Sequence, residues 1–209
     1  MSERLILLHG LWMPGISMSV LQRRLESAGY VVDSFDYLSV TTPLDVILAD
    51  LRERLRAGGE GTHVVGHSLG GLLALLACNG RADLPSGRIV CLASPLSGSA
   101  VARWFDEHVG SRMLGPGREL LLHGLAHWDG PREVGMLAGQ VAVGLGSMIG
   151  QVDGPNDGTV TVAETRLPGL IDHCVVPASH TGMLLSRTAA AQAVAFLRHG
   201  RFRDDLRDR

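Results

Sequence analysis

Lysine is absent from this chain of 209 residues, so all 19 of its Lys-or-Arg positions are arginines. The absence excludes enzymes that need a lysine amine: Schiff-base and PLP enzymes, Ser-Lys hydrolases, Walker P-loop NTPases and kinases. If the chain is an enzyme, its chemistry therefore depends on Ser, Cys, His, Asp and Glu.

An excess of positive charge is missing as well. The 19 arginines are balanced by 21 acidic residues, which gives a formal net charge of −2. Nucleic-acid-binding domains usually carry clustered basic residues and a high pI, so this balance favours a small-molecule partner and no nucleic acid. With 45% hydrophobic and 19% charged residues, the composition is typical of one globular domain, which we expect to span residues 1–209.

Cysteine is scarce in this chain. Cys78, Cys91 and Cys174 are an odd number of thiols, and each lies within an apolar segment. Secreted domains of this kind would carry paired cysteines, so the pattern indicates buried free thiols in a reducing compartment. We therefore expect a cytoplasmic protein.

Long apolar runs are also rare. The four apolar residues after Arg4 are too few for a signal peptide. Residues 134–150 carry no charge, but these 17 residues are too short to span a membrane and include five glycines. They favour a buried strand followed by a loop, and we expect no transmembrane segment.

Short branched apolar runs alternate with amphipathic stretches along most of the chain. This alternation is typical of βαβ units around a parallel sheet. The apolar runs predict strands at 4–8, 30–36, 62–67, 88–94, 133–139 and 172–177. The amphipathic stretches predict helices near 15–28, 43–57, 69–80 and 186–198. The predicted fold is therefore α/β, with a mostly parallel sheet of about six strands flanked by helices.

Two segments depart from this alternation. Residues 96–132 are irregular, with glycines, prolines and a weaker helical pattern near 99–109, and they lie between two predicted strands. At this length they predict a small cap inserted above the sheet and not a second domain. The tail at 198–209 is highly charged, so we expect it to fray.

A Ser stands in a tight turn between a predicted strand and a predicted helix. The turn reads Gly66-His67-Ser68-Leu69-Gly70, a G-x-S-x-G pattern. In such a turn the Ser has a strained backbone that exposes its hydroxyl, and side chains two residues to either side would collide with their neighbours. The pattern predicts Ser68 as a nucleophile, and the alternative is a glycine-rich turn with an ordinary Ser.

The first predicted strand ends in His9-Gly10-Leu11-Trp12. Acyl transfer builds negative charge on a carbonyl oxygen, and two preorganised N–H donors stabilise it. The N–H groups of Leu69, directly after the Ser, and of Leu11 are our candidates for this oxyanion hole. We expect His9 to order the loop and not to act as a base. The alternative is an ordinary turn at the end of a strand.

A nucleophilic Ser needs a His that a carboxylate orients. Of the nine histidines, His180 is the best placed, three residues beyond the last predicted strand and just before the final helix. Asp157 follows the fifth predicted strand and is the favoured carboxylate, with Asp153 as the alternative. The order Ser68, Asp157, His180 matches that of an α/β-hydrolase catalytic triad.

Together these motifs resemble those of small bacterial α/β-hydrolases of the lipase and esterase type, over roughly residues 4–199. The resemblance implies hydrolysis of carboxylic esters through an acyl-enzyme, with no metal or organic cofactor. It also implies an acyl ester as the small-molecule substrate. The cap is shorter than in larger members of the family.

Apolar side chains near these loops are candidates for an acyl pocket, although burial in the core is the ordinary role of each. The candidates for substrate binding are Trp12, Met13, Met148 and Met183, with Leu184 beside the last. A thioesterase, an acyltransferase or a lipid deacylase would use the same triad, so these activities stay open. A non-catalytic binding protein of the hydrolase fold is the alternative from another class.

Two histidines four residues apart, His123 and His127, have the spacing of a helical metal site, and Asp129 follows them. No Glu lies between them, and Gly124 weakens the helix that would align them. We therefore predict no metal site here.

Overall fold

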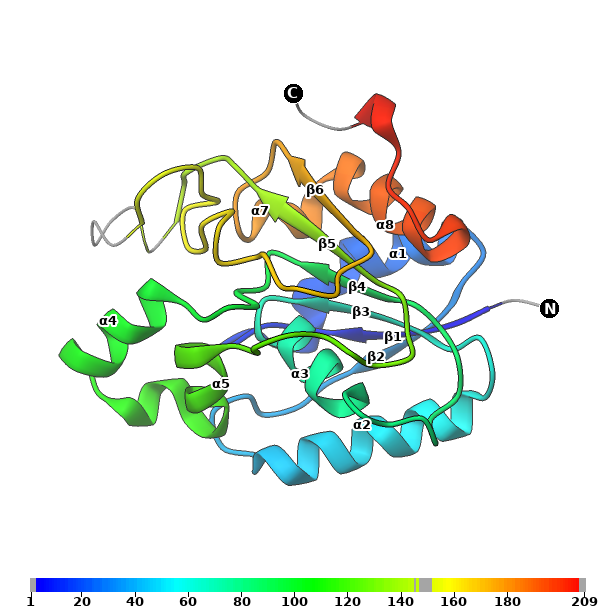
Figure 1. Cartoon of the computed structure of the whole chain (residues 1–209), viewed down its shortest axis with the longest axis horizontal. Coiled ribbons are helices and arrows are strands. Elements are labelled where there is room, and N and C mark those ends of the chain that lie inside the picture. Colours follow the sequence, from blue (N-terminus) through cyan, green and yellow to red (C-terminus); the bar gives the residue numbers. More distant parts are fainter. Residues whose placement is uncertain (1–2, 145, 147–151, 207–209) are drawn as a thin grey trace.

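The computed structural model describes residues 3–144, 146 and 152–206, and it contains a six-stranded sheet in which every pair of neighbours is parallel (Figure 1). The strand order is β2-β1-β3-β4-β5-β6. The strands are β1 (Arg4–Leu8), β2 (Val31–Phe35), β3 (His63–His67), β4 (Ile89–Leu92), β5 (Val134–Gly139) and β6 (Asp172–Val176). The predicted α/β class with a mostly parallel sheet is confirmed.

The position of each strand in the sheet explains its sequence. Every residue of β3, β4 and β5 is buried, because helices cover both faces of these inner strands. The edge strands β2 and β6 keep several residues partly or fully exposed, and each contains polar residues beside its apolar ones. Complete burial of a strand therefore marks the interior of the sheet.

Helices form a layer on each side of the sheet (Figure 1). One core contains side chains of α2 (Leu44–Gly58) and α3 (Leu69–Cys78), and the other contains side chains of α1 (Ser19–Ser27), α7 (Gly182–Leu185) and α8 (Arg187–His199). The three cysteines are buried. Within the described residues, no helix has both the length and the apolarity to cross a membrane.

Two predicted elements are shorter in the structure. The helix expected at 15–28 is divided into a 3-10 turn, η1 (Gly15–Met18), and α1. The strand expected at 88–94 ends at Leu92, because Ala93 has a φ of 51° and cannot continue the extended chain.

The charged tail does not fray up to Leu206, so this expectation was wrong for the described part. Phe202 is only 2% exposed and packs on Phe196 with ring centroids 4.9 Å apart. Gln192 of α8 donates to the Arg203 carbonyl and accepts from the Arg203 N–H. One buried aromatic ring and one buried amide thus hold a segment whose charge pattern indicates disorder.

The segment between β4 and β5 contains three helical elements, α4 (Ala100–His108), η2 (Ser111–Gly117) and α5 (Arg118–His123). In Figure 1 α4 and α5 lie beyond the carboxyl ends of the strands. The loops that follow β1, β3 and β5 emerge at the same edge. Ligands of open parallel sheets bind at this edge, so we expect a functional site here.

Candidate active site

Ser68 connects β3 to α3 through a strained backbone, with φ 53° and ψ −119°. The two flanking glycines make this turn possible. A Cβ atom at Gly66 would lie 2.5 Å from the Gly70 carbonyl carbon, and a Cβ at Gly70 would lie 2.6 Å from the His9 carbonyl oxygen. Strand, helix and the loop at residues 9–12 therefore approach closely only with glycine at both positions. We call residues 9–12 the oxyanion loop after the donor predicted at Leu11. The Ser68 side chain reaches a pocket.

Asp157 and His180 are joined by two hydrogen bonds. The His180 ring Nδ1 lies 2.9 Å from Asp157 Oδ2, and the His180 backbone N–H donates to the Asp157 carbonyl over 2.9 Å. The Asp157 side chain is 1% exposed. Because a carboxylate only accepts, Nδ1 carries the proton and Nε2 keeps its lone pair. Asp153, the alternative carboxylate, is exposed.

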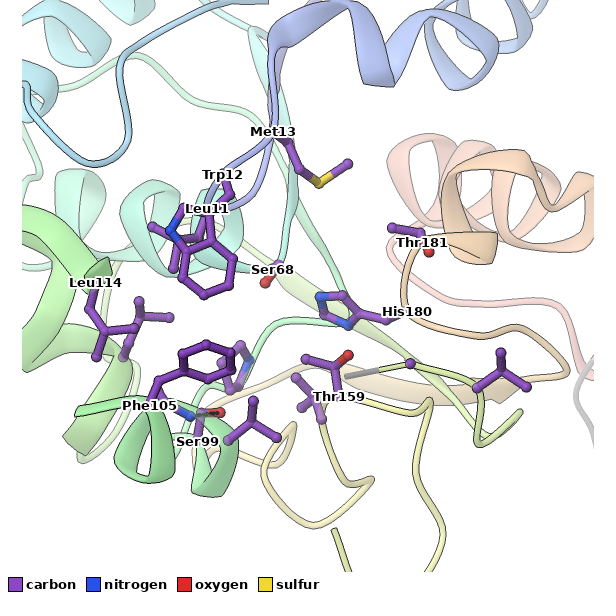
Figure 2. A pocket seen from close by; sticks show the side chains of 17 residues that line it. Leu11, Trp12, Met13, Ser68, Ser99, Phe105, Leu114, Thr159, His180 and Thr181 are labelled. Carbon is purple, nitrogen blue, oxygen red and sulfur yellow. Dashed lines mark hydrogen bonds between the residues drawn. The ribbon is translucent and has the colours of Figure 1, made fainter. Parts of the chain in front are cut away.

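Ser68 and His180 line the same pocket, and Figure 2 shows the His180 ring pointing toward the Ser68 side chain. The structure thus places all three predicted triad residues at the carboxyl edge of the sheet. It joins two of them by a hydrogen bond and brings the third into the same pocket.

The two predicted oxyanion donors are available. In the described part of the chain, neither the Leu11 nor the Leu69 N–H donates to a protein acceptor. The next N–H along the loop, that of Trp12, instead donates to Ser39 Oγ over 3.1 Å. Leu69 is the first residue of α3, where the helix dipole adds positive potential.

His9 orders the oxyanion loop from behind. Its buried ring stacks on Tyr37 with centroids 4.2 Å apart, and its Nδ1 lies 2.8 Å from the Gly10 carbonyl oxygen. The Tyr37 hydroxyl donates to the His9 carbonyl over 2.6 Å. Burial raises the pKa of the Tyr37 phenol, so the hydroxyl stays a neutral donor at ordinary pH.

His67 lies next to His180 and is fully buried. The two ring centroids are 4.8 Å apart, and His67 Nε2 lies 3.0 Å from the His180 carbonyl oxygen. A carbonyl only accepts, so His67 carries its proton on Nε2. Burial, and then the nearby His180, lower the pKa of His67 to about 3. His67 is therefore a neutral support for the His180 loop.

The pocket around Ser68 has a volume of about 330 Å³, and most of its walls are apolar. Trp12 and Met13, both predicted for substrate binding, line it (Figure 2). Met183 does not, because α7 turns its side chain into the core, where Met183 is 0% and Leu184 2% exposed. Met148 falls outside the described residues.

Sequence reasoning missed the residues that the segment between β4 and β5 contributes to the pocket. Apolar side chains from α4, η2 and α5 line the pocket: Val101, Ala102, Phe105, Leu114 and Leu121. Figure 2 shows Phe105 and Leu114 on the side of the pocket away from His180. Val101, Ala102 and Phe105 have the spacing of one helical face. This spacing is present in the weak helical pattern near 99–109, so the sequence contains a signal for this part of the pocket.

The histidine pair in this segment is not arranged as a helical metal site. α5 ends at His123 because Gly124 has a φ of 66°. His127 lies beyond this turn, and its ring is 3.3 Å from the Asp129 carboxylate. Among the described residues, no group of three or more His, Cys, Asp or Glu side chains is arranged to hold a metal ion.

Comparisons with known proteins agree with this architecture. The mature form of Bacillus licheniformis lipase BlEst2 is 18% identical, with a TM-score of 0.70, over 94% of this chain and 91% of that one. The metagenomic carboxyl esterase MGS0156 is 20% identical, with a TM-score of 0.67, over 86% of this chain and 64% of that one. Phospholipase PlaB from Legionella pneumophila is 17% identical, with a TM-score of 0.72, over 98% and 60%.

Identities this low establish a common fold and leave the reaction open. No curated protein sequence matches the chain. A model of the alpha/beta hydrolase family does match, over residues 5–203. Because this match spans all six strands and the Ser68 turn, the chain belongs to the alpha/beta hydrolase family.

Proposed function

We propose that this protein is a serine hydrolase that cleaves carboxylic esters through an acyl-enzyme. One observation carries the proposal: the His180 ring, bonded through Nδ1 to the buried Asp157 carboxylate, faces Ser68 in an apolar pocket. This arrangement provides a nucleophile, a base with a free lone pair and a group that orients the base.

The acylation step follows from these positions. Ser68 Oγ attacks the ester carbonyl carbon while His180 Nε2 takes the hydroxyl proton, and Asp157 stabilises the imidazolium that forms. The negative charge on the former carbonyl oxygen is stabilised by the N–H groups of Leu11 and Leu69, each contributing about 3 kcal/mol. His180 then gives its proton to the departing alcohol.

Deacylation repeats the same steps with water as the nucleophile. His180 takes a proton from water, the hydroxide attacks the acyl carbon, and Ser68 leaves with the returned proton. The cycle is complete with side chains and backbone amides alone. It requires neither a metal nor an organic cofactor.

The pocket favours an apolar acyl ester as the substrate. Leu11, Trp12, Phe105 and Leu114 surround the space beside Ser68 (Figure 2), and burial of an acyl chain against them releases water from both surfaces. In this proposal residues 1–209 form one hydrolase domain and residues 96–132 are its cap. Proteins of the same fold named lipase, carboxyl esterase and phospholipase are consistent with such a substrate.

Replacement of the nucleophile tests the proposal. We expect Ser68→Ala to reduce the hydrolysis of nitrophenyl acyl esters by at least about 10⁴-fold, because attack by water then lacks the acyl-enzyme route. Ser111→Ala, which alters an exposed Ser of η2, is the matched control and should keep wild-type activity. Hydrolysis by Ser68→Ala at the wild-type rate would refute the mechanism.

A fluorophosphonate probe separates this enzyme from a non-catalytic binding protein. The probe should label the wild type at Ser68 and leave Ser68→Ala unlabelled, because labelling needs a base-activated Ser. Comparison of acyl-CoA with simple esters, each with and without an added alcohol, then separates an esterase from a thioesterase and an acyltransferase. An unlabelled wild type would favour the binding protein.

A further inference from the structure

Trp12 has a backbone conformation that its side chain disfavours. Its φ is 58°, in the left-handed region, and it is one of three described non-glycine residues with positive φ, together with Ser68 and Ala93. Such a conformation costs on the order of 1–3 kcal/mol and persists only where the surroundings hold it. The Trp12 side chain remains at the protein surface with 40% exposure, so burial alone does not hold it.

Three contacts from three segments hold Trp12 instead. Its backbone N–H donates to Ser39 Oγ, in the loop after β2. Its indole Nε1–H donates to the Met113 carbonyl of η2 over 2.8 Å. Its ring meets the Phe105 ring of α4 edge to face, with centroids 5.2 Å apart.

The segments that hold Trp12 also pack directly on one another. Gly115 of η2 has a φ of 61°, and a Cβ there would lie 2.6 Å from Val40 Cα and 2.9 Å from the Ser39 carbonyl oxygen. The backbones of η2 and of the loop after β2 are thus in direct contact. Trp12 is hydrogen-bonded to both of these segments, so their contact gives the oxyanion loop a rigid support.

The peptide between Gly10 and Leu11, which carries the Leu11 N–H, is the one that matters for the reaction. Leu11 supplies an oxyanion donor in the proposed function, and the Trp12 N–H is turned away to Ser39. From this geometry we propose that Trp12 is a positioning residue, which fixes the Leu11 N–H by fastening the oxyanion loop to α4 and η2. This inference rests on the proposed function, since it concerns a donor for the same oxyanion.

The proposal differs from a simple role of Trp12 in the pocket wall. A wall residue contacts the acyl chain, so its replacement changes ground-state binding and affects long chains more than short ones. A residue that positions an oxyanion donor acts on the transition state of every ester alike. It leaves the binding of a ligand without a carbonyl group unchanged.

Trp12→Phe removes the indole N–H and keeps an aromatic ring beside Phe105. Trp104→Phe is the matched control, because Trp104 of α4 is a tryptophan that is not among the described residues that line the pocket. Ser39→Ala removes the acceptor of the Trp12 backbone N–H and leaves the indole hydrogen bond in place. The readouts are kcat/KM for nitrophenyl acetate and nitrophenyl octanoate, competitive inhibition by octanol, and the thermal midpoint of each variant.

We expect Trp12→Phe to lower kcat/KM about 10- to 100-fold, and by a similar factor for both esters, because a misplaced donor weakens oxyanion stabilisation. Inhibition by octanol should stay within about twofold of wild type, which corresponds to less than 0.5 kcal/mol of binding. Ser39→Ala should act in the same direction as Trp12→Phe, and Trp104→Phe should behave as wild type.

Two results would overturn the inference. One is a loss in Trp12→Phe confined to the octanoate ester together with weaker octanol inhibition, which would mean that Trp12 acts only as part of the pocket wall. The other is wild-type kcat/KM in both Trp12→Phe and Ser39→Ala. Either outcome in an enzyme that still labels at Ser68 leaves the proposed function intact, whereas a wild type that neither labels nor hydrolyses esters refutes the proposed function itself.

Discussion

At the scale of single residues, Asp157 directs the proton of His180 by the way its two oxygens are occupied. Oδ1 accepts from the backbone N–H groups of Thr159 and Val160, over 2.9 and 2.7 Å. Oδ2 is then the oxygen that faces His180. The turn after Asp157 thus fixes the orientation of the carboxylate independently of its contact with His180.

Asp157→Asn should preserve this geometry but move the His180 ring proton from one nitrogen to the other. The amide oxygen would stay on the two backbone N–H groups, so the NH₂ group would face His180 and turn its Nδ1 into an acceptor. The imidazole proton would move to Nε2, where it blocks the removal of the Ser68 proton. We expect kcat/KM for a nitrophenyl ester to fall about 10³- to 10⁴-fold.

The matched control is Asp153→Asn, because Asp153 is the exposed carboxylate four residues earlier. It should hydrolyse the same ester at the wild-type rate. A large loss in Asp153→Asn with little loss in Asp157→Asn would reassign the carboxylate. Circular dichroism of both variants checks that each is folded.

The sequence predicts that Ser68, Asp157 and His180 lie close together better than it predicts which side chains line the pocket. The motifs are short stretches of sequence: a Ser between two glycines, and a His just after a strand. Each of them indicates the end of a strand, and in a parallel sheet the loops at these ends lie close together. Pocket walls depend on the direction in which side chains turn. Met183 lies only three residues after His180, yet α7 directs it into the core.

At the scale of secondary-structure elements, Glu164 joins α4 to the loop that carries Asp157. Its Oε1 accepts from the Ala100 N–H at the start of α4, and its Oε2 accepts from the Thr161 N–H. Its side chain is 13% exposed. Val101 and Phe105 of α4 line the pocket. The Glu164 carboxylate therefore connects this apolar part of the pocket to the loop that carries Asp157.

Glu164→Gln should therefore loosen the start of α4. The amide keeps one oxygen acceptor, so one backbone N–H loses its partner, and the helix N-terminus loses a negative charge that stabilises it. We expect the free energy of unfolding in urea to fall by about 1–3 kcal/mol. Glu107→Gln, at an exposed site on the same helix, should change it by less than about 0.5 kcal/mol. Equal stabilities for the two variants would contradict this role.

The strands could be predicted because most of them contain a short apolar run, such as residues 5–8 and 89–92, whereas α5 and η2 could not. Their ends depend on glycines that approach distant backbone. A Cβ at Gly124 would lie 2.3 Å from the Leu96 carbonyl oxygen, and Gly115 packs on Val40 in the same way. Such contacts join segments far apart in the sequence, and no local periodicity encodes them.

At the scale of the whole molecule, the sheet separates two apolar cores, and the candidate site lies at its carboxyl edge, where polar groups enter the interior. Among the described histidines, His67 is the most deeply buried, with 0% exposure. His180, Asp157 and His9 surround it. The folded protein is therefore less stable in acid, because burial disfavours a protonated His67 imidazole.

The pKa of His67 is lowered to about 3 in the folded protein, against about 6.5 in an unfolded chain. Between these values the unfolded state binds more protons, so stability falls as the pH falls, by up to about 1.4 kcal/mol per pH unit. His67→Gln keeps an amide donor for the His180 carbonyl and does not titrate. Urea unfolding from about pH 6 to pH 4 should show a smaller slope for His67→Gln than for wild type, while the exposed-site variant His123→Gln keeps the wild-type slope. Equal slopes would mean that His67 is protonated in the folded state.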